Sequence, residues 1–453
     1  MTAIQSDVID SSVNNSTFLA KAATPTSVGK EGEYEGFFPV EPSSLKEAGL
    51  THAEVEGFCL RYLLTCGTGS GRAIADNLKM PFNLVGDVLQ SLKDQLLLTY
   101  RDSAPMNDYV YELSEQGLVR ARRRAEHCTY FGAAPVRISD YVEAVRRQSV
   151  DKVKPKPADL RRAFADLQLS DAVVSQIGQA VTGGRAMFLY GAPGNGKTSI
   201  AERVIRSVSE HVWIPRSVTV TDEIIRVFDP ACHEEVPLDI SSGALSSHKV
   251  DRRWVRVKRP TVVAGGELTL EMLECHVNPS TGVNEAPLQM KSNCGALVID
   301  DFGRQRISTT ELLNRWIIPL EKGHDYIMLP SGRHIQIPFA QLLIFSTNLD
   351  PRQIVDEAFL RRIPYKIEVM DPSDNEFRQL FCRTANKMGF SFQSKVVDHL
   401  IAKHYVPTGR PLRFCHARDM LLQVKNLCDF HDLKYVLSEE AIDVAAFNYF
   451  AGL

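Results

Sequence analysis

The segment that most restricts the fold of this chain is residues 188–204, FLYGAPGNGKTSIAERV. A short apolar stretch leads into a turn with three glycines, and an amphipathic helical pattern follows the turn. In such a turn, successive backbone N–H groups converge on one point, and the amino terminus of the next helix adds the positive end of its dipole. The sequence therefore predicts a loop that binds phosphate groups, placed between a strand and a helix.

The residue types in this loop suit a bound nucleotide. Glycine permits the backbone angles and the close approach to phosphate that the loop requires. Lys197 is expected to reach the β- and γ-phosphates of ATP, and the hydroxyl of Thr198 is expected to bind Mg²⁺. The residues expected to contact the nucleotide are Gly191, Ala192, Pro193, Gly194, Asn195, Gly196, Lys197, Thr198 and Ser199.

A second apolar strand pattern, GALVIDDFGRQ, ends in two adjacent carboxylates. Asp300 is predicted to be the Mg²⁺ carboxylate of a Walker B motif. Asp301 follows it and is predicted to polarise the attacking water, because geometry decides which carboxylate can act as the base. In the alternative interpretation, Asp301 only caps the next turn.

Further polar residues stand next to two later strand patterns and in the last helical segment. The strand in HIQIPFAQLLIFSTNLDP ends at Asn348, which could hold the attacking water or sense the γ-phosphate. The stretch DEAFLRRIPYKIEV carries Arg361 and Arg362, and an arginine delivered into a neighbouring site would stabilise the charge of the transition state. GRPLRFCHARDMLLQV offers Arg413 and Arg418.

Taken in order, the phosphate-binding loop, LVIDD, STN, DEAFLRRI and HARDMLL resemble the AAA+ ATPases over roughly residues 160–440. The resemblance implies an α/β fold, with a five-stranded parallel sheet covered by helices on both faces and a carboxyl-terminal helical lid. It implies that Asn348 is sensor 1. It matches Arg362 best to the arginine finger, with Arg361 second, and Arg418 best to the sensor 2 arginine, with Arg413 as a rival.

This sequence departs from the usual AAA+ pattern at one position. Most hexameric ATPases have glutamate where this chain has Asp301, whose side chain is shorter by one methylene, roughly 1.5 Å. Either the backbone lies closer to the nucleotide, or hydrolysis is slow, or a second group helps. A chain that hydrolyses ATP slowly would act as a nucleotide-dependent switch.

Two features point to one group within the AAA+ ATPases. Residues 326–338, YIMLPSGRHIQIP, predict a β-hairpin just before the sensor 1 strand, and residues 217–290 leave room for a helical insert near GGELTLEMLE. The stretch VNEAPLQMKSNCGALVIDD resembles the run into Walker B in MoxR-type, magnesium-chelatase-type and enhancer-binding ATPases. The features together resemble the MoxR-like group best, and this group is generally taken to remodel protein complexes. An arginine finger acting on a neighbour implies a homo-oligomeric ring, and the resemblance suggests a hexamer.

The sequence as a whole predicts five parts. Residues 1–38 are expected to be a disordered leader, 39–125 a winged-helix domain, 126–160 a stiff polar connector, 161–370 the AAA+ core and 371–453 the helical lid. The stretch AIADNLKMPFNLVGDVLQSLKDQLLL resembles winged helix-turn-helix domains of bacterial regulators.

The partner of the winged-helix domain stays open between protein and DNA. Its third helix carries Asp87 and Asp94 beside its polar and basic residues, so it is nearly neutral and favours a protein client. The run from Arg120 to Arg124 could contact phosphates and favours a DNA-bound ATPase or transcriptional regulator. Another basic run, residues 251–260, could line the pore of a ring or form a solvated strand edge.

The composition of the chain limits its partners and its location only broadly. The net charge of -3 gives no general attraction to nucleic acid or to anionic membranes. No apolar run is long enough for a membrane span, and nine cysteines without a Cys-x-x-Cys pair suit a reducing compartment, so a cytoplasmic location is expected.

Overall fold

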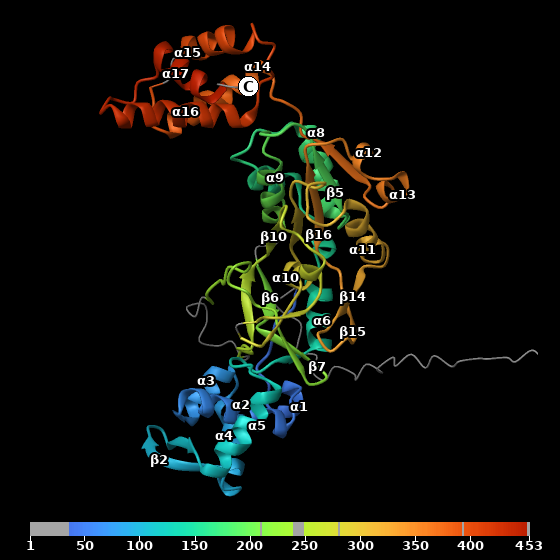
Figure 1. The fold of residues 1–453 in the computed structure, drawn as a ribbon, viewed down its shortest axis with the longest axis vertical. Helices are drawn as coiled ribbons and strands as arrows, with labels where there is room; N and C mark the ends of the chain where they lie inside the picture. Colours follow the sequence, from blue (N-terminus) through green and yellow to red (C-terminus); the bar gives the residue numbers. More distant parts are fainter. Residues whose placement is uncertain (1–35, 209–210, 239–248, 280, 392–393, 451–453) are drawn as a thin grey trace, which may run out of the picture. The chain divides into compact units, whose positions relative to one another are not determined.

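The computed structural model describes residues 36–208, 211–238, 249–279, 281–391 and 394–450 (Figure 1). Most of the leader expected at residues 1–38 therefore lies outside the described residues. None of the described helices is long and apolar enough to cross a membrane.

A five-stranded parallel sheet forms the centre of the nucleotide-binding region. Its strand order is β10-β13-β16-β5-β17, and every neighbouring pair is parallel. The strands are β10 (Thr261–Ala264), β13 (Ala296–Ile299), β16 (Leu342–Thr347), β5 (Met187–Tyr190) and β17 (Tyr365–Glu368). Together with the covering helices, it confirms the predicted α/β fold class with a five-stranded parallel sheet.

Alternating side chains bury both faces of this sheet. Met187 and Leu189 pack into a cluster with α8 (Asp171–Thr182) and α9 (Lys197–Val204). Phe188, between them, packs into the cluster that contains Trp316 of α11. Because successive side chains of a strand point to opposite faces, an uninterrupted apolar run such as MFLY suits a strand that is covered on both sides. The helices on the periphery of this region are α7 (Pro157–Ala163), α10 (Leu288–Ser292), α11 (Thr309–Lys322), α12 (Pro351–Ile354) and α13 (Glu357–Leu360).

The region expected to hold a helical insert is mostly β-structure. A mixed sheet with the order β11-β12-β8-β7-β4 and an antiparallel pair β6-β9 occupy it. Among its described residues, the helical elements are a single 3-10 turn at Glu271–Leu273 and the short α10. The reason is composition: HVWIP, SVTV, EIIR and WVRVK are rich in β-branched and aromatic residues, which favour strands. The strands are β4 (Val136–Arg137), β6 (His211–Pro215), β7 (Ser217–Val220), β8 (Glu223–Arg226), β9 (Trp254–Lys258), β11 (His276–Val277) and β12 (Asn284–Glu285).

The segment expected to be a connector, residues 126–160, also differs from that expectation. It contains β4, which pairs with β7, and α6 (Ile138–Gln148), in which Tyr141 and Val145 are buried. The Tyr141 hydroxyl donates a hydrogen bond to the Met290 carbonyl at 3.2 Å. Long-range packing, which a local Lys/Pro pattern does not reveal, integrates this segment with the β-rich region.

A β-hairpin precedes the β16 strand, as the sequence predicted. Strands β14 (His324–Met328) and β15 (His334–Pro338) pair over their full length in antiparallel register. The turn is closed by the Leu329 N–H, which donates to the Arg333 carbonyl at 2.7 Å. Gly332 has a φ of 81°, a left-handed conformation that glycine adopts without strain.

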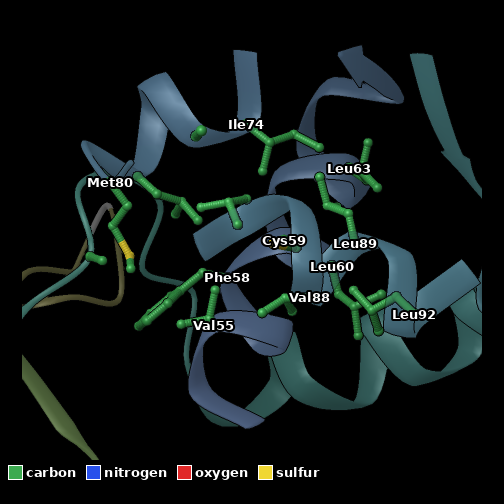
Figure 2. Packing of buried hydrophobic residues seen from close by; sticks show 14 of the residues in the cluster. Val55, Phe58, Cys59, Leu60, Leu63, Ile74, Met80, Val88, Leu89 and Leu92 are labelled. Atoms are coloured by element: carbon green, nitrogen blue, oxygen red, sulfur yellow. The ribbon is translucent and has the colours of Figure 1, made fainter. Parts of the chain in front are cut away.

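In the amino-terminal described region, the single-turn helix α1 (Leu45–Ala48) is followed by three longer helices and then a hairpin. The helices α2, α3 and α4 bury a common apolar cluster around Leu60 and Leu89 (Figure 2). Strands β2 and β3 form the hairpin, and β1 completes a sheet of order β1-β3-β2. The elements are α1 (Leu45–Ala48), α2 (His52–Cys66), β1 (Thr68–Ser70), α3 (Gly71–Leu78), α4 (Phe82–Asp94), β2 (Leu98–Ala104), β3 (Asp108–Leu113) and α5 (Glu115–His127).

Arginines from two basic runs of the sequence form ion pairs in the structure. On α5, Arg120 and Arg124 contact the buried Glu56 carboxylate, Arg120 at 2.5 Å. Arg253 is buried, pairs with Asp251 and donates to a carbonyl of α1. Arg253 and Arg259 are both buried, so at these two positions the run 251–260 is not a solvated edge. Arg252 and Lys258 are about half exposed, and a role of the run in the pore of a ring stays a hypothesis.

The carboxyl-terminal region is helical, with its own apolar core. Phe377, Leu400, Met420 and Ile442 come from different helices and pack into one buried cluster. The elements are α14 (Asp374–Lys387), α15 (Ser394–Leu400), a π-helical turn at Ile401–Tyr405, α16 (Phe414–Phe430) and α17 (Glu439–Phe450).

Candidate nucleotide site

The predicted phosphate-binding loop connects β5 to α9. Gly191 has a φ of 135°, and a Cβ at this position would lie 2.5 Å from the Val369 carbonyl oxygen, so a side chain has no room there. Gly194 has a φ of 86°. The helix α9 begins at Lys197, directly after the loop, so its free N–H groups face the loop. This geometry supplies the backbone donors that a phosphate group needs.

Lys197 connects the loop to the neighbouring strand. Its Nζ donates to the carbonyls of Gly191 and Ala192, both at 3.0 Å, and to the Oδ1 of Asn348 at 2.6 Å. Burial lowers the pKa of Lys197, while the carboxylates of Asp300 and Asp301 act in the opposite direction. The buried ammonium is therefore held by uncharged oxygens close to the loop.

Two acidic residues at the end of β13 lie beside the loop. The Thr198 hydroxyl donates to the Asp300 Oδ2 at 2.9 Å, and the Asn348 Nδ2 donates to the Asp301 Oδ1 at 3.3 Å. Because β13, β16 and β5 are parallel neighbours, their carboxyl ends meet at one edge of the sheet. The structure thus brings together the side chains of Lys197, Thr198, Asp300, Asp301 and Asn348.

Asp301 has an unusual backbone. Its φ is 48°, a left-handed conformation that costs energy for a residue other than glycine. The Gln305 Nε2 donates to the carbonyls of Asp300 and Asp301, at 2.8 and 3.2 Å. This clamp stabilises the turn and leaves the exposed Asp301 carboxylate directed to Asn348. Among the described residues, that carboxylate accepts no hydrogen bond from a helix N-terminus. Sequence reasoning missed Gln305, although it stands in the same quoted motif.

Residues from the helical region reach the other side of the loop. The Cys415 N–H donates to the Gly194 carbonyl at 2.9 Å. The buried Asn195 donates through Nδ2 to the Asp371 Oδ1 at 2.7 Å, and Arg413 is paired with the same carboxylate oxygen. Asp371 and Cys415 were not predicted, because nothing in the local sequence links them to the loop.

The two candidate arginines of the helical region differ in position. Arg413 is the N-cap residue of α16 and contacts Asp371 beside the loop. Arg418 is 67% exposed and pairs with its neighbour Asp419. Among the described contacts, only Arg413 is therefore tied to a group that also holds the loop, whereas the sequence had favoured Arg418.

The two candidate finger arginines lie away from the loop. Arg362 donates to the Glu321 Oε1 and to the Ala358 carbonyl, at 2.7 and 2.9 Å. Arg361, next to it, is exposed. Both precede β17, so they stand at the amino-terminal edge of the sheet, opposite the phosphate-binding loop.

The residues around Thr198 fit a magnesium ion bound with a nucleotide. Mg²⁺ prefers oxygen ligands and is usually held by one or two side chains, with water and phosphate oxygens completing the shell. The Thr198 hydroxyl and the Asp300 carboxylate form such a donor pair. In the described part of the chain, no group of three or more His, Cys, Asp or Glu residues is placed to hold a metal without a nucleotide.

Comparisons with known proteins give one family match and several distant solved structures. Residues 373–448 match a family described as a domain of unknown function, DUF8689. No curated protein matches the chain significantly. Among solved structures, NtrX from Brucella abortus is 13% identical with a TM-score of 0.38, and the match covers 62% of this chain and 56% of NtrX. NtrX in complex with ATP is 13% identical with a TM-score of 0.37, covering 72% and 64% of the two chains. RuvB from Thermotoga maritima, described as a Holliday junction branch migration motor, is 12% identical with a TM-score of 0.33, covering 67% and 72%.

Proposed function

We propose that this protein is a Mg²⁺-dependent ATPase of the AAA+ type. The observation that carries the proposal is the continuous set of contacts from Lys197 through Asn348 to Asp301, next to the Thr198–Asp300 pair. A lysine, a hydroxyl and two carboxylates converging on a glycine-rich loop are the groups needed to bind a nucleoside triphosphate and to activate water.

Each side chain has a separate task in the proposed reaction. Lys197 exchanges its bonds to loop carbonyls for the β- and γ-phosphates. Asp301 accepts a proton from the attacking water, and Asn348 orients that water or senses the γ-phosphate. Thr198 and Asp300 would hold Mg²⁺, which neutralises charge on the phosphates when it is bound. The short Asp301 side chain is offset by a turn that the Gln305 amide fixes.

We further propose that the chain works as a homo-oligomeric ring, with six copies as the expected number. Arg362 and Arg361 stand at the edge of the sheet that is opposite the loop of the same chain, so they suit a nucleotide held by another copy. In the lid, Arg413 is better supported than Arg418 as the arginine that responds to the nucleotide, because of its contact with Asp371.

The work that we propose for ATP is the remodelling of a protein complex, with the amino-terminal winged-helix domain docking the client. Support comes from the pairing of Arg120 and Arg124 with Glu56, which removes half of the basic run from contact with phosphates. The alternative is a DNA-bound ATPase, and the exposed Arg122 and Arg123 on the same helix favour it.

Steady-state hydrolysis by the full chain tests the ATPase proposal. We expect phosphate release from ATP with Mg²⁺ and none in EDTA. Asp301→Asn should keep ATP bound while turnover stops. An Asp301→Asn variant that hydrolyses ATP as fast as the parent would exclude Asp301 as the base.

The same stalled variant distinguishes the two partners. Loaded with ATP and used to capture partners, Asp301→Asn should enrich a protein that Lys197→Ala does not. DNA that is retained instead, and released steeply as salt rises, would establish the alternative function.

A further inference from the structure

Three arginines gather at the amino-terminal edge of the parallel sheet. Arg185 precedes β5, and Arg361 and Arg362 precede β17. These strands are parallel neighbours, with Met187 opposite Tyr365, so the residues before them meet at one edge.

The three arginines line a cavity of about 470 Å³ that contains a single carboxylate. That carboxylate belongs to Glu321, and the Arg362 Nε donates to it at 2.7 Å. Arg185 and Arg361 are exposed, and within the described ranges neither guanidinium forms a hydrogen bond or ion pair. Positive charge therefore exceeds negative charge in this cavity.

The cavity adjoins a larger one, of about 860 Å³, and shares Arg185, Glu321 and Arg362 with it. The larger cavity adds Arg146, Lys152 and Lys322, against the single additional carboxylate of Asp151. Like charges at short range repel one another, so a concentration of cations without partners favours an anionic ligand. The planar guanidinium pairs with phosphate oxygens through two parallel hydrogen bonds, which makes phosphate the best match.

The phosphate cannot come from the nucleotide of the same chain. Arg185 and Gly191 lie at opposite ends of β5, and six residues of extended strand span about 20 Å. Arg362 is tethered to Glu321 and to the Ala358 carbonyl, which leaves Arg185 and Arg361 as the arginines free to reach a ligand.

We propose that Arg185, together with Arg361, binds a phosphate group at this edge, and that the phosphate belongs to the nucleotide on a second copy of the chain. The inference rests on the proposed ATPase function and extends it. It adds Arg185, outside the motif that carries Arg361 and Arg362, to the groups that stabilise charge in the neighbour's site. Of the two arginines that precede β17, Arg361 then contacts the phosphate, and Arg362 acts as a positioning residue that keeps Glu321 neutralised.

ATP turnover of the full chain tests the role of Arg185. Arg185→Ala should lower turnover about tenfold or more, while the affinity for a fluorescent ATP analogue and the melting temperature stay unchanged. Arg185→Lys, which keeps the charge but loses the planar fork, should recover part of the rate. Arg161→Ala, at a residue whose side chain is 70% exposed on α7, is the control and should change neither quantity. An Arg185→Ala variant with the parent's turnover overturns the proposal.

Mixing two variants identifies the source of the phosphate. Lys197→Ala copies keep the arginines but lose the nucleotide, and Arg185→Ala copies keep the nucleotide. If the phosphate belongs to a second copy, the mixture should turn over ATP faster than the two variants measured separately. A mixture without recovery overturns the second copy as the source of the phosphate. If Lys197→Ala protein then binds inorganic phosphate and the double variant Lys197→Ala/Arg185→Ala does not, the cavity is a site for free phosphate.

The phosphate-binding measurement also separates this inference from the proposed function. If the parent protein hydrolyses no ATP, the ATPase proposal fails, and binding of inorganic phosphate to Lys197→Ala protein still decides whether the arginine edge holds an anion. No binding above that of the double variant would then overturn the edge as a phosphate site.

Discussion

The two edges of the parallel sheet differ in how completely their charges are paired. At the carboxyl-terminal edge, Lys197, Asp301 and Asn348 share one set of hydrogen bonds. At the amino-terminal edge, Arg185 and Arg361 line a cavity where the only carboxylate, Glu321, is already paired with Arg362. The first edge has its charged groups organised by hydrogen bonds, and the second carries an excess of positive charge. In a ring, each edge would supply what the next copy lacks.

The strongest test of the organised edge is the removal of its lysine. Lys197→Ala should lower the affinity for ATP and Mg²⁺ by about a thousandfold or more, because the β- and γ-phosphates lose their only buried cation in the loop. Titration with a fluorescent ATP analogue measures this effect. Unchanged affinity would show that the contacts of Lys197 serve folding and not the nucleotide.

The base assignment should give the next largest effect. Asp301→Asn keeps the size of the side chain but cannot accept a proton, so the turnover number should fall about a hundredfold or more while ATP affinity is kept. Gln305→Leu is a matched change at the clamp. It should lower turnover less, because it frees the turn and leaves the carboxylate in place. Equal losses in the two variants would argue that Asp301 acts only through its backbone.

A smaller effect separates the two arginines of the helical region. Arg413→Ala should weaken ATP binding or turnover by about tenfold, because Asp371, which also holds Asn195, loses its cation. Arg418→Ala should be almost neutral, since the Arg418 side chain is largely exposed and pairs only with the adjacent residue, Asp419. The reverse order would restore the assignment that the sequence favoured.

The side-chain amide of Gln341 is buried at the amino-terminal edge of the sheet and allows a test of what an unpaired polar group costs the fold. Gln341 lines the larger cavity, and neither its Nε2 nor its Oε1 has a hydrogen-bond partner among the described residues. Gln341→Leu should therefore be neutral or stabilise the fold by up to about 1 kcal/mol in denaturant unfolding. Gln289→Leu is the control, because the Gln289 Nε2 donates to Leu273 and Asp325, and it should cost about 1–3 kcal/mol.

The smallest effect is a pH dependence at Lys197. Its pKa is lowered from 10.5 by burial, so the unfolded chain binds more protons than the folded chain between the lowered pKa and 10.5. The free energy of unfolding should then rise with pH in that window, relative to Lys197→Met, by less than about 1 kcal/mol. A relative decrease would mean that the surrounding carboxylates outweigh burial.

Local motifs allowed the sequence to predict the loop, the residues after β13 and β16, and the hairpin of β14 and β15. In these cases the chemistry and the strand pattern lie within one short segment. The sequence did not predict the β-rich region, because its short strands pair across segments as distant as Val136 and Val218. It also missed the contact of Asn195 with Asp371, which joins residues far apart in the chain. Such contacts depend on tertiary packing, which a single sequence without a motif does not reveal.

The Asp371 carboxylate couples the phosphate-binding loop to the helical region. It accepts a hydrogen bond from Asn195 of the loop and is paired with Arg413 at the start of α16. A change on one side of this carboxylate therefore alters the free energy of the other. Thermodynamic linkage then requires reciprocity: a partner that grips the helical region shifts the affinity for ATP by the same factor by which ATP shifts the affinity for that partner.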